Sequence, residues 1–195
     1  MNPRILNLPN CITIGRMAVL PLIVVVMMAL NDQATGRALL ANQMLSLFSA
    51  LLVCAAMISD VIDGYLARKY GVISAFGQLI DPLADKLLFL TAMIMMIPLG
   101  RLPAWIVVIF LSRELTVTSL RAIAVERGIV IAASKLGKYK SAFISSAIVG
   151  LLIHYPFFGV KWRLIAWVLM LPSLVLSIAS GVDYVWGFIR QTKTK

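Results

Sequence analysis

The chain of 195 residues is too apolar and too sparsely charged for an ordinary soluble domain. Hydrophobic residues make up 61% of it and charged residues 13%, and its mean hydropathy is +0.96. A soluble domain is about half apolar and about a quarter charged. The net charge of +10 is then better explained by loops facing an anionic leaflet than by nucleic acid, so we expect no nucleic-acid partner.

Six apolar stretches are each long enough for a membrane-spanning helix, which needs about 20 mostly apolar residues. They predict an all-α fold, a polytopic six-transmembrane-helix bundle that forms a single domain over residues 1–195. Ahead of them, Asn2–Asn10 mixes apolar and polar residues and predicts either a short interfacial helix or a frayed terminus. In chain order, the stretches lie near residues 12–30, 42–66, 80–99, 103–125, 139–156 and 164–188.

The second stretch is rich in small residues. Ala55 and Ser59, for example, are four positions apart, a spacing that lets helices approach closely. The pattern predicts tight helix packing, either within one chain or across a dimer interface.

The distribution of basic residues predicts the orientation in the membrane. If the N-terminus is cytoplasmic, most loop and terminal Lys and Arg residues also lie on the cytoplasmic side. We therefore expect a multi-pass protein of the cytoplasmic membrane with both termini inside the cell. Only four basic residues fall in the opposite loops: Arg37, Arg101, Lys161 and Arg163.

Four of the eight acidic residues lie close together, at Asp60, Asp63, Asp81 and Asp85. Residues three or four apart share one face of a helix, so each pair lies on one face. The first pair ends the second stretch and the second pair begins the third, at the same membrane face. A short loop joins the two helices, so the four carboxylates are expected to converge at a cytoplasm-facing site.

Such a group of carboxylates at a membrane is unfavourable unless cations neutralise it. Two divalent cations would balance four negative charges, and two ions about 4 Å apart can hold both the attacking and the leaving oxygen in a phosphoryl displacement. The segment contains no His or Cys. The hard oxygen ligands therefore favour Mg²⁺ or Mn²⁺ over zinc or copper.

Small residues and one arginine accompany the carboxylates. Gly64 directly follows Asp63 and lets a substrate approach the backbone. Ala67 and Gly77 are small and leave space for a substrate between the two helices. Arg68 offers a fork of hydrogen-bond donors suited to a diphosphate. This combination predicts a phosphoryl-transfer site.

These residues match the signature of the CDP-alcohol phosphotransferases, D-x2-D-G-x2-A-R-x8-G-x3-D-x3-D, at every position from Asp60 to Asp85. The resemblance implies a six-span bundle, often dimeric, so a homodimer is expected. It also implies that the first three aspartates are metal ligands and that Asp85 is both a ligand and the general base. Contacts to the nucleotide lipid are implied for Gly64, Arg68 and Ser74, and Gly77 is expected to belong to the same binding site.

Three other segments resemble the branch of this family that makes phosphatidylglycerophosphate. They are Asn7–Arg16 with Pro21, Ser112–Leu115 with Arg121, and Gly137–Ser141, although the branch usually has Thr where this chain has Ser141. The resemblance implies transfer of a phosphatidyl group from CDP-diacylglycerol to glycerol 3-phosphate. Phosphatidylglycerol or serine as acceptor, and a divalent-cation transporter or channel, are the alternatives.

Basic residues on the fourth and fifth stretches fit an acceptor that carries a phosphate. Arg113 lies near mid-span, where a charge should face a polar cavity, and we expect Glu114 beside it to pair with a base. His154, the only histidine, is expected near the opposite membrane face and not in catalysis. The predicted acceptor-phosphate residues are Arg113, Arg121, Lys138 and Lys140.

Overall fold

The computed structural model describes residues 8–70, 75–126 and 135–193, and within these ranges the fold is all-α, as predicted. Each predicted stretch corresponds to one helix, with bounds that differ by a few residues. Of the predicted interfacial segment, residues 2–7 lie outside the described residues and Leu8–Asn10 begin the first helix. The helices are α1 (Leu8–Met28), α2 (Arg37–Tyr70), α3 (Ala75–Met96), α4 (Ala104–Glu126), α5 (Lys135–Ile153) and α6 (Trp162–Lys193).

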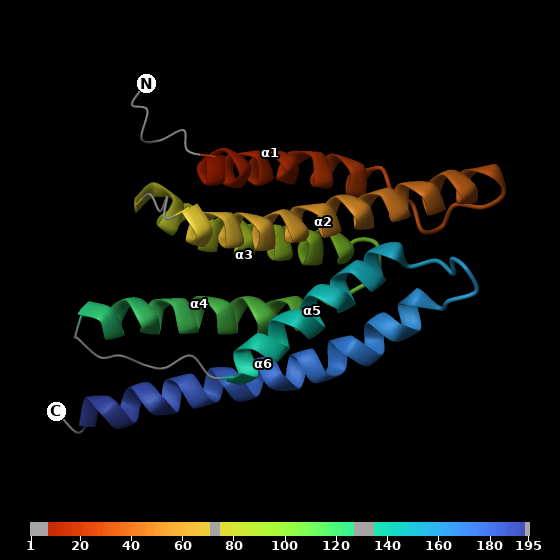
Figure 1. Cartoon of the computed structure of the whole chain (residues 1–195). Helices are drawn as coiled ribbons and strands as arrows, with labels where there is room; N and C mark the ends of the chain where they lie inside the picture. The colour runs from red at the N-terminus through yellow and green to blue at the C-terminus, as the bar shows by residue number, and fades with distance from the viewer. Residues whose placement is uncertain (1–7, 71–74, 127–134, 194–195) are drawn as a thin grey trace.

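The helices run roughly along one long axis and alternate in direction (Figure 1). The N-terminal ends of α1, α3 and α5 and the C-terminal ends of α2, α4 and α6 lie together at one end of the molecule, here called the site end. The turns after α1, α3 and α5 lie at the other end, the distal end. Helix α1 packs on α2 and α3, α6 packs on α4 and α5, and α2, α3 and α5 join the two halves.

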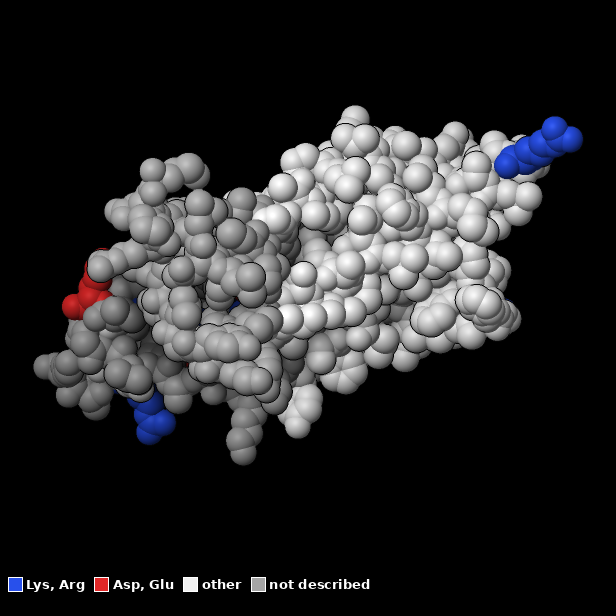
Figure 2. Space-filling view, turned by 45° about the horizontal axis from the view of Figure 1, so that its top comes forward, with Lys and Arg blue, Asp and Glu red and all other residues white. Residues whose placement is uncertain are grey.

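The interior is apolar, and so is much of the outer surface. Ile23, Val53, Phe110 and Ile148 are among the buried side chains. Many large apolar side chains point outward, and charged side chains on the visible face lie toward the two ends of the molecule, with an uncharged band between them (Figure 2). An apolar belt between charged ends is the surface expected of a protein whose solvent at mid-height is lipid.

Two described segments are long and apolar enough to cross a membrane, Arg37–Ser59 in α2 and Trp162–Gln191 in α6. Shorter apolar stretches lie in α1, α3 and α5. In α4 the apolar run is interrupted by charged residues, Arg113, Glu114 and Arg121. The predicted helices are therefore present, and the two long segments make a membrane protein plausible.

The small residues of α2 serve packing within the chain. Ser46, Ser49 and Ala50 are buried, and the Ser46 hydroxyl donates to the Leu152 carbonyl of α5 at 2.7 Å. Ala55, by contrast, is exposed. Part of the small-residue pattern is thus explained by the contact between α2 and α5.

Helices α5 and α6 come closest at Gly150. A Cβ atom placed there would lie 2.9 Å from the Ala166 Cβ and 3.4 Å from the Trp162 carbonyl oxygen. Neither atom is the end of a flexible side chain, so the helices themselves would have to separate. Gly150 is therefore required by packing rather than by backbone conformation.

We expect Gly150→Ala to destabilise the fold by about 1–3 kcal/mol, the usual cost of overpacking. The midpoint of thermal unfolding in detergent measures this. Gly187→Ala in α6 is the matched control, since nothing lies within 4 Å of its added Cβ. Ala166→Gly should restore stability to the Gly150→Ala protein; a midpoint equal to that of the wild type in Gly150→Ala alone would contradict the close approach.

The turn after α3 buries an arginine at the distal end. Gly100 adopts a φ of 66°, its N–H donates to the Ile97 carbonyl, and the Arg101 N–H donates to the Met96 carbonyl. This pattern is a Schellman motif, which ends a helix with a left-handed glycine. It directs Arg101 inward, where its side chain has no exposed surface.

The buried guanidinium of Arg101 joins four segments of the chain. It donates two hydrogen bonds of 2.6 Å to the Asp32 carboxylate, and others of 2.7 Å to the Ser46 hydroxyl and the Leu152 carbonyl. Tyr155 donates to Asp32 at 3.1 Å. Arg101 thus lies in a loop of the distal end, as predicted, but a bidentate ion pair neutralises its charge.

The Asp32–Arg101 pair predicts a loss of stability in acid. Burial alone would raise the pKa of Asp32, but the hydrogen bonds and positive charge of Arg101 hold it below the ordinary value. Such a carboxyl stabilises the fold above its unfolded pKa, near 3.9, and loses this contribution as the pH falls through the lower folded pKa. Asp32→Asn should cost about 3 kcal/mol at pH 7 and remove this part of the acid sensitivity.

Thermal unfolding midpoints measured from pH 7 down to pH 3 check this expectation. Asp183→Asn, at an exposed position of α6, is the control for loss of a carboxylate alone. Parallel pH profiles for the wild type and Asp32→Asn would contradict the role given to the pair.

Candidate active site

The backbone places the two aspartate pairs at the site end. Asp60 and Asp63 lie in the last third of α2, and Asp81 and Asp85 lie in the first half of α3. Both helices are continuous through these positions, so the spacings of three and four put each pair on one helix face. The four aspartate side chains lie outside the described part of the structure. Among the described side chains, no group of three or more His, Cys, Asp or Glu lies together.

The residue types at this end fit divalent cations by their donor chemistry. Four carboxylates on two neighbouring helices supply hard oxygen donors and four negative charges. The residues predicted to bind the nucleotide lipid lie in the same two helices. Gly64 and Arg68 belong to α2, and Gly77 belongs to α3. Ser74 lies outside the described residues.

A cavity of about 260 Å³ begins one residue after Asp85 and extends toward mid-height between α3, α4 and α5. The lining residues nearer the site end are mostly polar, and those nearer mid-height are apolar. Because Lys86 lines it, the cavity adjoins the backbone position of the predicted general base. The lining residues are Lys86, Phe89, Leu90, Met93, Phe110, Glu114, Lys140, Ser141 and Ile144.

Glu114 is the centre of a polar cluster at this cavity. Its carboxylate accepts a hydrogen bond from the buried Lys140 ammonium of α5 and another, at 2.9 Å, from Arg113. The expectation that Glu114 pairs with a base is thus confirmed, and it pairs with two. Lys86 of α3 donates to the Thr118 hydroxyl, which donates in turn to the Glu114 backbone carbonyl at 2.7 Å.

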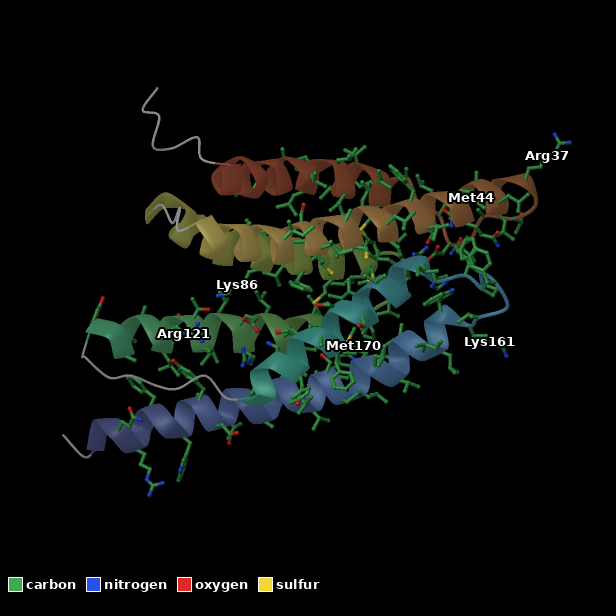
Figure 3. The ribbon with its side chains drawn as sticks, viewed as in Figure 1. Arg37, Met44, Lys86, Arg121, Lys161 and Met170 are labelled. Atoms are coloured by element: carbon green, nitrogen blue, oxygen red, sulfur yellow. The ribbon has the colours of Figure 1, made fainter. Side chains whose placement is uncertain are left out.

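The Glu114 cluster therefore ties three helices together beside the cavity. Figure 3 shows Lys86 reaching from α3 toward α4. Among the described side chains here, Arg113 and Lys140 pair with the Glu114 carboxylate and Lys86 lies nearby, so three positive charges face one negative charge. The excess of positive charge among these described side chains suits an anionic ligand group.

Arg113 faces α6 more than it faces the cavity. It donates a 2.9 Å hydrogen bond to the Ser180 hydroxyl, and a Cβ at Gly181 would lie 3.0 Å from its side chain. It lines a separate hollow of about 340 Å³ between α4 and α6. Its Nε is buried without a partner among the described atoms.

The structure thus brings together only part of the predicted acceptor set. Lys140 lines the cavity, and Arg113 contacts it through Glu114. Arg121 is exposed and lies about two turns further along α4 than Arg113. Lys138 belongs to α5, but its side chain lies outside the described part.

Sequence reasoning missed Lys86 and Thr118. Lys86 directly follows Asp85 and interrupts an apolar run, and a lysine inside a predicted span is a signal for a polar cavity. Thr118 gave no such signal, since a lone threonine is unremarkable in a membrane helix. Its role depends on the side-by-side placement of α3 and α4, which only the fold supplies.

Comparison with known proteins agrees with this arrangement. The family model described as CDP-alcohol phosphatidyltransferase matches residues 6–179, which covers all four aspartates and the Glu114 cluster. The chain belongs to the CDP-alcohol phosphatidyltransferase family. Enzymes of this family generally use divalent metal ions, in keeping with the carboxylate donors of α2 and α3.

Several CDP-alcohol phosphatidyltransferases are similar over almost their full length. A Bacillus subtilis protein named CDP-diacylglycerol–glycerol-3-phosphate 3-phosphatidyltransferase is 37% identical, over 91% of this chain and 93% of its own. A Mycobacterium tuberculosis protein named probable phosphatidylglycerophosphate synthase is also 37% identical, over 97% and 88%. A Rickettsia felis protein with the same name as the Bacillus protein is 31% identical, over 93% and 92%.

Proposed function

We propose that this CDP-alcohol phosphatidyltransferase transfers the phosphatidyl group of CDP-diacylglycerol to glycerol 3-phosphate, giving phosphatidylglycerophosphate and CMP. The names of its similar relatives describe this reaction. The observation that carries the proposal for this chain is the cationic Glu114 cluster beside the backbone of Asp85. An acceptor that carries a phosphate needs such cations, and an uncharged acceptor does not.

Two divalent ions, Mg²⁺ or Mn²⁺, would be held by Asp60, Asp63, Asp81 and Asp85. When bound, they would neutralise charge that develops on the transferred phosphoryl group. Arg68 binds the diphosphate of CDP-diacylglycerol, Gly64 and Gly77 leave room for it, and Ser74 contacts the nucleotide. The acyl chains lie between the helices.

In the reaction, the 1-hydroxyl oxygen of glycerol 3-phosphate attacks the phosphorus nearer the lipid. A new P–O bond forms, the bond to the bridging diphosphate oxygen breaks, and CMP leaves with that electron pair. Asp85 takes the hydroxyl proton. An ordinary aspartate has a pKa near 3.9 and is a weak base, but it can accept a proton lost in the transition state, as the Asp of protein kinases does.

The acceptor phosphate binds Lys140 at the cavity, with Lys138, Arg121 and Arg113 contributing from the same end of α4 and α5. Lys86 is added to this set because it lines the same cavity. Glu114 offsets part of the positive charge of Lys140 and Arg113 before the acceptor arrives.

The protein acts in the cytoplasmic membrane as a six-span bundle, with the site end and both termini facing the cytoplasm. Basic residues support this orientation, and the neutralised Arg101 strengthens the charge difference between the two ends. Two copies form a homodimer.

Lys140→Gln and Arg113→Gln are expected to raise the KM for glycerol 3-phosphate about tenfold or more. Loss of one partner of a buried charged pair typically costs about 2–5 kcal/mol, and tenfold is about 1.4 kcal/mol. The KM for CDP-diacylglycerol should change little. Steady-state kinetics with each substrate varied in turn measure both constants.

Two further variants separate binding from folding. Glu114→Gln breaks the same ion pairs but keeps both cations, so it should not raise the KM for glycerol 3-phosphate. Arg37→Gln removes a positive charge at the distal end (Figure 3) and should change neither constant. If Glu114→Gln reproduces the effect of Lys140→Gln, or if both KM values rise equally, these residues hold helices together and do not bind the acceptor.

A further inference from the structure

A second cavity lies at the distal end, far from the aspartates. It is a groove of about 630 Å³ beside the turn from α5 into α6. None of its lining residues belongs to the proposed catalytic or substrate-binding sets. They are His154, Tyr155, Pro156, Lys161, Arg163, Leu164, Trp167, Val168 and Leu171.

The turn that forms this groove is tight and aromatic. His154, Phe158 and Gly159 have positive φ angles of 59°, 56° and 73°, and Phe157 forms an isolated bridge with Val160. Phe158 is 97% exposed at the tip. A phenylalanine presented in this way is unfavourable in water but is well placed at a membrane interface.

The groove is cationic at its mouth and apolar along its length. Lys161 and Arg163 are exposed and have no ion-pair partner among the residues that the structure describes. The nearby carboxylate of Asp32 is already bound to Arg101. The positive charge at the mouth is therefore uncompensated.

The apolar part of the groove follows one face of α6. Leu164, Val168 and Leu171 are spaced four and three residues apart, so they share a face, and they are 64%, 62% and 59% exposed. Trp167 stands beside them, partly buried. The indole ring prefers the boundary between head groups and acyl chains.

We propose that this groove binds an anionic phospholipid from the leaflet at the distal end. Its phosphate contacts Lys161 and Arg163, and one acyl chain lies along Leu164, Val168 and Leu171. A zwitterionic lipid carries its own cation, which offsets the attraction. This inference rests on the membrane-spanning arrangement of the proposed function.

Quenching of Trp167 by brominated lipids tests the proposal. The full-length protein with Trp105, Trp162 and Trp186 changed to Phe is placed in bilayers that contain brominated phosphatidylglycerol or brominated phosphatidylcholine. The association constant at Trp167 should be at least about fivefold higher for phosphatidylglycerol, since each basic residue near the surface contributes about 1 kcal/mol. Lys161→Gln with Arg163→Gln should bring the ratio close to one.

A protein that keeps only Trp105 is the matched control. Trp105 is 57% exposed at the distal start of α4 and lies outside the groove, so it should be quenched about equally by both lipids. Equal quenching of Trp167 by the two lipids would overturn the proposal. So would relief of its quenching by inorganic phosphate, which would assign the groove to a soluble anion.

The test also separates this groove from the catalytic proposal. Asp63→Asn in the Trp167 protein should keep the full preference for phosphatidylglycerol while lacking phosphatidyl transfer. Loss of the preference in that variant would contradict an independent site. Absence of quenching at both Trp105 and Trp167 by either lipid would overturn the membrane arrangement itself.

Discussion

Asp60→Asn, Asp63→Asn and Asp81→Asn should each lower phosphatidyl transfer more than about a thousandfold. Each change removes one of the proposed metal ligands, and such ions supply several kcal/mol of charge stabilisation in the transition state, where about 1.4 kcal/mol is a factor of ten in rate. Chelation should abolish the activity of the wild type, and Mg²⁺ or Mn²⁺ should restore it. Transfer is measured as release of CMP from CDP-diacylglycerol by the purified protein.

The control for these variants is Asp183→Asn, the same chemical change at an exposed position of α6, which should keep wild-type activity. The three aspartate variants and this control should also unfold at a thermal midpoint close to that of the wild type, which shows that they are folded. Full activity of an aspartate variant in the presence of chelator would contradict metal-dependent transfer.

Asp85→Asn is expected to reduce kcat by about 10²–10⁴-fold, the usual contribution of a general base. The affinity for CDP-diacylglycerol should fall much less, and loss of the metal contact would add to the effect on kcat. Turnover at saturating substrate, with equilibrium binding of the nucleotide lipid measured separately, distinguishes the two quantities.

A companion variant makes the Asp85 result specific. Lys86→Met alters the adjacent residue and its contact with Thr118 but leaves the carboxylate, so it should affect the KM for glycerol 3-phosphate more than kcat. Normal turnover of Asp85→Asn at saturation, combined with weak lipid binding, would assign Asp85 to binding instead of proton transfer.

The helices could be predicted because the signal for them is local. An apolar run of sufficient length predicts a helix without knowledge of its neighbours. Their bounds were less accurate, because a helix continues through polar residues that hydropathy assigns to loops. The second helix, predicted at residues 42–66, extends from Arg37 to Tyr70 in the structure.

The aspartate pairs were also visible in the sequence, since spacings of three and four fix a helix face. The Glu114 cluster was not. Glu114, Lys140 and Lys86 come from three helices, and their contacts depend on how those helices pack. Sequence reasoning recognised that Glu114 would pair with a base, but it could not choose the partners.

Arg101 shows the same limit at the distal end. A hydropathy pattern treats a basic residue in a short loop as exposed, yet the Schellman turn at Gly100 directs this side chain into the protein toward Asp32. The glycine before it is a local signal for the turn. The ion pair itself joins residues on two different loops, which no local pattern encodes.

The most direct test of the central claim is a competition between acceptors. The purified wild-type protein is given labelled CDP-diacylglycerol together with glycerol 3-phosphate, phosphatidylglycerol and serine, with and without chelator. We expect the label to appear in phosphatidylglycerophosphate, with one CMP released for each product, and we expect chelator to prevent both. Label found only in products of phosphatidylglycerol or serine, with glycerol 3-phosphate left unused, would contradict this expectation.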